Sequence, residues 1–378
     1  MKRKNLWMSI VLLPLVSCGE ASVDKTSSFN YSTFEEQAQT YSINDVLANM
    51  TVEGRSLATD DGLTFDYSGS ALKFNLNCQG QVSINLTSEM TTTYDDSSEG
   101  KRGMTLFSVF VDGERTIKNL KADNETIELT IADNLPEGPH SFVFARQTNV
   151  YMSLVTIHSL TFKGTMIEKD ASSGYIEYIG DSYTSGYSLQ GTKEGGGYDS
   201  SYDDPLDAYA YQSAKNLNSD YSLMAFSGAG FSYGYTPFTV PEVYPYLNYF
   251  RDDSFTYTPT VTPDLIVINL GTNDVSQVGF NNNHEQIEKG VKKLLDEVFA
   301  LYKKTLPLII CTDATHENND PVTTEAIETY YPDLDYKLVT LTTNDAKYNY
   351  HPSAECGNKQ GQELAAAIKE YLPSVFNK

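Results

Sequence analysis

The pattern of apolar and polar residues changes near residue 170 and divides the chain into two parts. From Tyr41 to Lys163, apolar and polar residues alternate in short runs separated by turn residues such as Asp112-Gly113. Alternation with a period of two predicts strands that bury one face, and many such runs at regular spacing favour a β-sandwich. We therefore predict an all-β domain over residues 41–165. The clearest runs are 72–76, 82–86, 107–111, 127–131, 141–145 and 155–162.

In the second part, predicted strands alternate with predicted helices. The strands are continuous apolar runs, which are typical of a buried parallel sheet. The helices carry apolar residues at helical spacing, and Asn283 is placed to cap the second of them. This order predicts an α/β domain over residues 175–378, with a parallel sheet between helices, after a polar linker at 166–174. The predicted strands are 175–179, 221–226, 264–270, 307–311 and 337–341, and the helices are 208–217, 284–304 and a last one from near Ser353.

The first residues are typical of an export signal. Lys2, Arg3 and Lys4 precede an apolar stretch too short to span a membrane, which ends in Leu-Val-Ser-Cys at Cys18. This ending resembles a bacterial lipobox, which implies that residues 1–18 are a lipoprotein signal peptide and that Cys18 carries the lipid. Residues 19–40 would be a flexible tether. We expect an exported, membrane-anchored bacterial lipoprotein, periplasmic or on the cell surface; the alternative is an ordinary signal peptide with an incidental cysteine.

Composition narrows the possible partners. The chain has 378 residues and a formal net charge of −23, which disfavours binding to nucleic acid and to anionic membrane surfaces, so the lipid anchor is the expected membrane contact. Cys78, Cys311 and Cys356 are an odd number without CxxC spacing, so we expect at most one disulfide and no metal site. No cofactor is implied, and we expect a monomer.

Polar residues follow the predicted strands of the second domain. Ser182 comes after the first strand, Gly228 after the second and Asn273 after the third, while His351 precedes the last helix. The carboxyl ends of parallel strands meet at one edge of a sheet, so these groups can converge there. A hydroxyl, an imidazole and N–H donors are the groups that acyl transfer requires. Each residue alone also has an ordinary use in turns or caps.

The order of these groups resembles the SGNH, or GDSL-type, hydrolase superfamily. The resemblance covers about residue 175 to the C-terminus and implies a flavodoxin-like α/β fold. It implies that Ser182 is the nucleophile and His351 the general base. The N–H groups of Ser182 and Gly228 and the side-chain amide of Asn273 would form the oxyanion hole. Gly230 competes with Gly228 for its role, and His316 is the rival base.

One position departs from this superfamily. An aspartate usually lies three residues before the histidine, where it orients the imidazole. This chain has Tyr348 there. We therefore predict a Ser182–His351 dyad, whose ring is held by a backbone carbonyl or by an acid from elsewhere. Asp345 and Asp313 are the candidates, and the sequence does not choose between them.

Most of the mature chain resembles carbohydrate esterase family two. The resemblance is carried by segments 107–113, 138–142, 146–149, 180–187, 268–274 and 351–353. It implies a jelly-roll sandwich before the hydrolase domain and removal of O-acetyl groups from polysaccharides or oligosaccharides of the acetyl xylan or glucomannan type. Asn149 is a departure, because the family commonly has an acidic residue there. Two alternatives stay open: a lipase-like or arylesterase enzyme, and a non-catalytic carbohydrate-binding lipoprotein.

Overall fold

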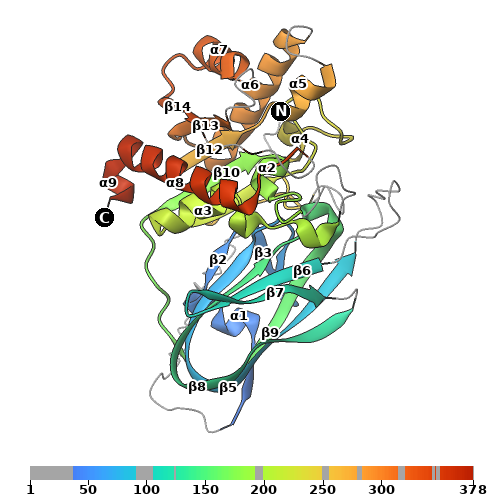
Figure 1. The fold of residues 1–378 in the computed structure, drawn as a ribbon, viewed down its shortest axis with the longest axis vertical. Coiled ribbons are helices and arrows are strands. Elements are labelled where there is room, and N and C mark those ends of the chain that lie inside the picture. Colours follow the sequence, from blue (N-terminus) through green and yellow to red (C-terminus); the bar gives the residue numbers. More distant parts are fainter. Residues whose placement is uncertain are drawn as a thin grey trace, which may run out of the picture.

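The computed structural model describes residues 37–90, 105–122, 125–191, 199–248, 255–278, 283–313, 320–342, 345 and 350–377. These residues form the predicted two-domain fold, with an antiparallel β domain followed by an α/β domain (Figure 1). The predicted signal peptide, Cys18 and nearly all of the predicted tether lie outside the described residues. Within the described residues, no helix combines the length and the apolar character that a membrane span requires.

The N-terminal domain consists of antiparallel strands joined in one curved sheet. Its central path runs β3-β4-β9-β5-β8-β6-β7, while β1 pairs with β9 and β2 with β5. The curved sheet surrounds a core of aliphatic and phenylalanine side chains (Figure 1). The strands are β1 Gln39–Ser42, β2 Thr51–Glu53, β3 Ser56–Thr59, β4 Gly62–Phe65, β5 Ala71–Met90, β6 Thr105–Val111, β7 Glu114–Ala122, β8 Thr126–Arg146 and β9 Ser153–Ile167, with the short helix α1 Ile43–Val46.

Two strands are much longer than the sequence pattern predicts. The runs predicted as separate strands at 72–76 and 82–86 both belong to β5, and those at 127–131 and 141–145 both belong to β8. The reason is a row of glycines at the bend. Cys78 of β5 pairs with Gly138 of β8 and with Gly164 of β9, and Gly80 follows two residues later. All three glycines have positive φ, so the strands turn sharply here without ending.

We expect Gly164→Ala to destabilise the protein by about 2–3 kcal/mol or more. A Cβ at this position would lie 2.1 Å from the carbonyl oxygen of Asn77, at a φ of +141°. The matched control is Gly80→Ala, where φ is +78° but nothing lies within 4 Å of the added Cβ. Denaturant unfolding of both variants measures the difference. Equal losses for the two would show that crowding at the bend is unimportant.

The C-terminal domain is built on a parallel sheet of order β11-β10-β12-β13-β14. This is the flavodoxin-like order 2-1-3-4-5, which confirms the predicted fold class. β9 extends to Ile167, two residues into the segment predicted as the linker. The strands are β10 Tyr175–Gly180, β11 Asp220–Ala225, β12 Leu265–Asn269, β13 Leu308–Asp313 and β14 Tyr336–Leu341. The helices are α2 Ser182–Ser185, α3 Tyr209–Leu217, α4 Val240–Val243, α5 Thr272–Val278, α6 His284–Tyr302, α7 Asp320–Tyr330, α8 Ala354–Tyr371 and α9 Pro373–Phe376.

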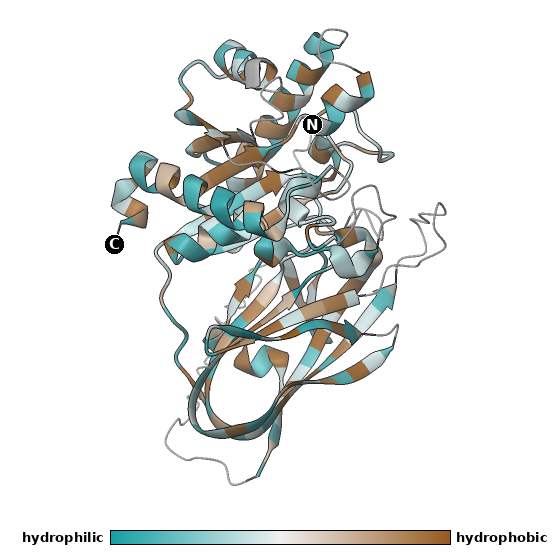
Figure 2. Cartoon of the chain, in the orientation of Figure 1, coloured by the Kyte–Doolittle hydropathy of each residue, from teal (hydrophilic) through white to brown (hydrophobic). Residues whose placement is uncertain are grey.

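Helices cover both faces of the parallel sheet. Alternate residues of β12 point to opposite faces, so Ile266 packs in the same core as α6, while Val267 packs in the same core as α3 and α8. The strands are accordingly apolar along their length, and the exposed helix faces are polar (Figure 2). Asn283 precedes α6 as predicted, but its side chain does not cap the helix; its Oδ1 accepts a hydrogen bond from the hydroxyl of Tyr233.

A buried arginine joins the two domains. Arg55 lies between β2 and β3 and is fully buried, as is its partner Glu177 of β10. The Arg55 Nε and Nη2 donate to Glu177 Oε1 at 3.2 and 3.0 Å, and its Nη1 donates to the carbonyl of Tyr244. The hydroxyls of Tyr244 and Tyr302 donate to Glu177 Oε2 at 2.6 and 3.1 Å. Both the guanidinium of Arg55 and the carboxylate of Glu177 therefore have hydrogen-bond partners within the interface.

Asn149 belongs to a second contact between the domains, which accounts for its departure from the family pattern. Its Nδ2 donates to Asp203 Oδ2 at 2.6 Å, and Asp203 Oδ1 accepts the N–H of Ser188. All three residues are fully buried. An acidic residue at position 149 would place a second buried negative charge against the Asp203 carboxylate. The amide of Asn149 donates a hydrogen bond to that carboxylate instead.

Candidate active site

Ser182 lies where β10 ends, at the carboxyl edge of the parallel sheet. Asp181 precedes α2, and its Oδ1 accepts the N–H of Tyr183 at 3.0 Å, which caps this short helix. Ser182 is therefore the first helical residue, and its own N–H has no intrahelical acceptor. Gly180 is required by close packing, since a Cβ there would lie 2.0 Å from Thr184 Oγ1. The turn places a hydroxyl and an N–H donor at the edge of the sheet.

The imidazole of His351 reaches this hydroxyl from the other end of the sequence. His351 Nε2 lies 2.7 Å from Ser182 Oγ, a hydrogen-bond distance between residues 169 positions apart. Ser182 is buried, at 7% exposed, and His351 is partly buried. The structure thus brings together the two residues that sequence reasoning placed in the dyad.

Two tyrosines from the serine turn flank the imidazole. The ring centroids of Tyr183 and Tyr187 lie 5.2 and 4.9 Å from that of His351. The Tyr183 hydroxyl also donates to the carbonyl of Tyr350 at 3.1 Å, which ties the segment before His351 to the serine turn. Sequence reasoning missed this contact, because spacing alone does not show which tyrosines meet the histidine.

Of the two acids considered for orienting the ring, Asp345 holds the segment that follows the histidine. Its carboxylate accepts both the N–H and the hydroxyl of Ser353, the residue that caps α8. Tyr348, the rival base His316 and the side chain of Asp313 lie outside what the structure describes.

Gly228 lies on the loop after β11 with φ +83°, a conformation that favours glycine. Its carbonyl accepts the N–H of Tyr235 at 2.7 Å, so the loop folds back on itself. Gly230 has a different role, since a Cβ there would lie 2.2 Å from Asp274 Oδ2. Gly230 is thus explained by packing, and Gly228 keeps the candidate donor position.

Asn273 connects the serine turn with the glycine loop. Its Nδ2 donates to Asp181 Oδ2 at 3.1 Å and to the carbonyl of Ala229 at 2.9 Å. The amide therefore lies beside both Ser182 and Gly228. Donation to an oxyanion would replace one of these two bonds.

Asp274 fixes the glycine loop, a role that sequence reasoning missed. Its Oδ2 accepts the N–H of Phe231 at 2.8 Å, and its Oδ1 accepts those of Ser232 and Tyr233 at 2.7 Å each. Burial raises the pKa of Asp274 to about 6, although the three N–H donors oppose this shift. The signal in the sequence was the adjacent pair Asn-Asp, in which each side chain binds a different segment.

We expect Asp274→Asn to remove a pH dependence of stability. The carboxyl has an ordinary pKa of 3.8 and a folded-state pKa of about 6, so the folded protein holds the proton more tightly. Its contribution to the free energy of unfolding is greatest below pH 3.8 and falls as the pH rises to about 6, by about 3 kcal/mol in total. Denaturant unfolding of both proteins between pH 4 and 7 measures the difference, and parallel curves would contradict the assignment.

Two exposed aromatic side chains lie next to these groups. Tyr235 is 61% exposed and follows the glycine loop, and Tyr350 is 85% exposed and directly precedes His351. The backbone of Tyr350 has a φ of +63°, which is unusual for a tyrosine. Among the other described tyrosines of the predicted Tyr-rich loops, Tyr209, Tyr211 and Tyr244 are buried packing residues, and the rest are partly buried. The exposed pair offers flat apolar surface, one ring next to the glycine loop and the other next to His351.

One group of side chains among the described residues has the composition of a metal site. His284 and Glu288 of α6 lie near Glu325 of α7, with ligand atoms within 4.8 Å of one another. The ring nitrogens of His284 already face carboxylates, at 3.0 Å for Glu325 and 3.8 Å for Glu288. The cluster is explained as a surface ion-pair group between two helices.

Comparisons with known families assign both domains. Residues 178–373 match the GDSL-like lipase/acylhydrolase family, and residues 52–169 match the carbohydrate esterase 2 N-terminal family. Cellulase/esterase CelE of Acetivibrio thermocellus is 28% identical over 179 residues, which is 46% of this chain and 22% of that protein. The chain thus spans about a fifth of the length of this relative.

Solved structures share the two-domain fold. An acetyl xylan esterase from the rumen bacterium Butyrivibrio proteoclasticus superposes with a TM-score of 0.78 at 17% identity, over 89% of this chain and 99% of that chain. A family two carbohydrate esterase from Clostridium thermocellum, in complex with cellohexaose, has a TM-score of 0.74 at 23% identity, over 86% and 99%. At these identities the likeness shows the fold.

Proposed function

Because the chain belongs to the GDSL-like lipase/acylhydrolase family, enzymes that act on ester bonds, we propose that it removes O-acetyl groups from carbohydrate. The proposed substrates are acetylated polysaccharides or oligosaccharides of the acetyl xylan or glucomannan type. Ser182 is the nucleophile and His351 the general base. The observation that carries the proposal is the 2.7 Å distance between His351 Nε2 and Ser182 Oγ.

In the proposed reaction, Ser182 Oγ attacks the acetyl carbonyl while His351 Nε2 takes the hydroxyl proton. The tetrahedral intermediate collapses, and the sugar oxygen leaves with the proton from His351. Water, deprotonated by His351, then attacks the acetyl-serine, and acetate leaves as Ser182 recovers its proton. The rings of Tyr183 and Tyr187 support the imidazole through both steps.

The negative charge that develops on the carbonyl oxygen requires donors. The N–H groups of Ser182 and Gly228 and the Nδ2 of Asn273 are the proposed oxyanion hole. Asn273 is held between Asp181 and Ala229, and the Gly228 loop is held by Asp274. The Asn273 amide exchanges one of its two hydrogen bonds for the oxyanion. Each donor is worth roughly 3–4 kcal/mol of barrier.

Three observations support a carbohydrate substrate. Tyr235 and Tyr350 offer exposed rings beside the site, which suit the apolar face of a sugar ring. The net charge of −23 favours neutral over anionic substrates. The structural relatives include an acetyl xylan esterase and an esterase in complex with cellohexaose.

The experiment is a comparison of acyl groups and acceptors. We expect acetate release from acetylated xylan or glucomannan, with kcat/KM falling at least tenfold between acetyl and hexanoyl esters of one alcohol. Rising kcat/KM with chain length would favour the lipase-like alternative. Binding of the polysaccharide without acetate release from either acetylated substrate would favour the non-catalytic binding protein.

A further inference from the structure

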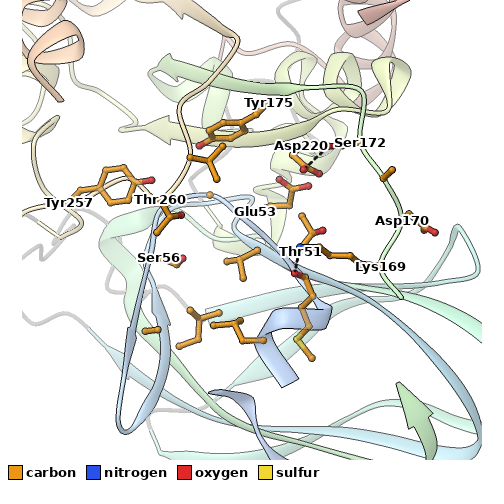
Figure 3. A pocket seen from close by; sticks show the side chains of 18 of the residues that line it. Thr51, Glu53, Ser56, Lys169, Asp170, Ser172, Tyr175, Asp220, Tyr257 and Thr260 are labelled. Atoms are coloured by element: carbon orange, nitrogen blue, oxygen red, sulfur yellow. Dashed lines mark hydrogen bonds between the residues drawn. The ribbon is translucent and has the colours of Figure 1, made fainter. Parts of the chain in front are cut away.

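A cavity lies between the two domains, away from Ser182. Its volume is about 510 Å³, within the range of about 300–1,000 Å³ that is common for small-molecule sites. Its walls come from the N-terminal domain around Thr51 and Ser56, from the segment after β9 that includes Lys169, and from the loop at Tyr257 and Thr260 (Figure 3).

The cavity and the active site lie at opposite ends of the parallel sheet. Tyr175, the first residue of β10, lines the cavity, and so does Asp220, the first residue of β11. Ser182 follows the other end of β10. The six residues of the strand span roughly 16 Å. A ligand in this cavity therefore does not contact the dyad.

The lining has an apolar side and a polar side. Met50, Val52 and Leu63 contribute aliphatic surface, and Tyr175 and Tyr257 contribute aromatic rings. Figure 3 shows Tyr175 and Tyr257 at one end of the cavity, Glu53, Asp220 and Ser172 beside them, and carbon side chains at the opposite end. The hydroxyl residues of the lining are Thr51, Ser56, Ser172, Thr258 and Thr260.

Carboxylates outnumber ammonium groups in the lining. Asp170 is exposed and can accept hydrogen bonds from a ligand. Asp220 is partly exposed and already accepts from Lys73 Nζ at 3.3 Å and from the Ser172 hydroxyl at 2.8 Å. The ammonium of Lys169 already donates to the carbonyl of Met50 at 3.2 Å. Glu53 forms the back wall, and burial raises its pKa to about 7 although Lys73 opposes this. The lining disfavours anions and offers acceptors for hydroxyl groups.

We propose that this cavity binds a neutral saccharide of one or two pyranose rings, at a site separate from the catalytic serine. A pyranose has an apolar face and a rim of hydroxyl groups, which match the tyrosine and aliphatic side and the carboxylate and hydroxyl side of the cavity. The inference rests on the proposed function and extends it, because it gives a carbohydrate esterase a second binding site for its polysaccharide substrate.

Val261→Trp provides a reporter at the cavity rim. Val261 lines the cavity and is 58% exposed, and the chain has one native tryptophan, Trp7. We expect xylobiose, which has no acetyl group to lose, to change the fluorescence of the full-length variant saturably with a millimolar Kd. Glucuronate should bind at least fivefold more weakly, because its carboxylate meets that of Asp170. Adding Ala58→Phe, which places a ring in the lining, should weaken xylobiose binding at least fivefold.

The matched control is Leu338→Trp, a tryptophan at an exposed position of β14 that is 41% exposed. Its fluorescence should not change with xylobiose. Hydrolysis of 4-nitrophenyl acetate should stay within twofold of the wild type in every variant. No saturable change in Val261→Trp up to about 50 mM xylobiose, or equal changes in both reporters, would overturn the inference. Retained esterase activity in that case would leave the proposed function standing.

Discussion

Replacing Ser182 with alanine is expected to lower kcat for acetate release by about ten-thousand-fold or more, with little change in substrate affinity. The substitution removes the oxygen that forms the acetyl-enzyme in the proposed reaction, and with it the proton that His351 is proposed to take. The oxyanion donors remain, so residual catalysis above the rate in water is expected. Initial rates of acetate release and the Kd of an unacetylated oligosaccharide measure the two effects separately.

Ser185→Ala is the matched control, because it removes a buried hydroxyl from the same short helix. The Ser185 Oγ donates to the carbonyl of Ser182 at 3.3 Å, so its loss should cost about 1 kcal/mol of stability and less than tenfold in kcat. Acetate release by Ser182→Ala at a rate close to the wild type would rule out the nucleophile assignment.

Replacing Arg55 with methionine is expected to lower the free energy of unfolding by about 3–5 kcal/mol. The change leaves Glu177 as a buried carboxylate without its counter-charge, although two tyrosine hydroxyls still donate to it. It also removes the guanidinium that packs over the rings of Tyr244 and Tyr257, at 4.3 and 4.6 Å from their centroids. Denaturant unfolding measures the loss.

Two further variants make this result specific. Lys289→Met breaks an exposed ion pair with Glu285, and almost no loss of stability is expected. Adding Glu177→Gln to Arg55→Met removes the unpaired charge and should restore part of the stability. If Arg55→Met were as mild as Lys289→Met, the buried pair would not be what holds the interface.

The sequence predicted the fold class well, and its errors have identifiable causes. Parallel strands such as β12 are uninterrupted apolar runs, and α6 has regular helical spacing, so local patterns were sufficient. The bends of β5 and β8 were predicted as strand ends, because Gly80 and Gly138 are turn residues in sequence and bend residues in the sheet. Asn283 precedes α6 but does not cap it, because its side chain accepts a hydrogen bond from the hydroxyl of Tyr233, which is distant in sequence.

The residue types of the candidate site could be predicted from the sequence. The residues that hold them in place could be predicted only in part. Motif order placed Ser182 and His351 in a pair before any distance was known. The contacts of Asp181 with Asn273 and of Asp274 with the glycine loop depend on where loops return in space, which spacing does not encode. The rings beside His351 were unpredictable for the same reason.

The position of Glu177 on β10 has a practical consequence for anyone who would clone the hydrolase half by itself. A fragment beginning at Tyr175 would carry the proposed nucleophile, but it would lack Arg55, the only guanidinium partner of Glu177 among the described residues. The two halves should consequently be expressed, and exchanged between chimeras, as one inseparable unit.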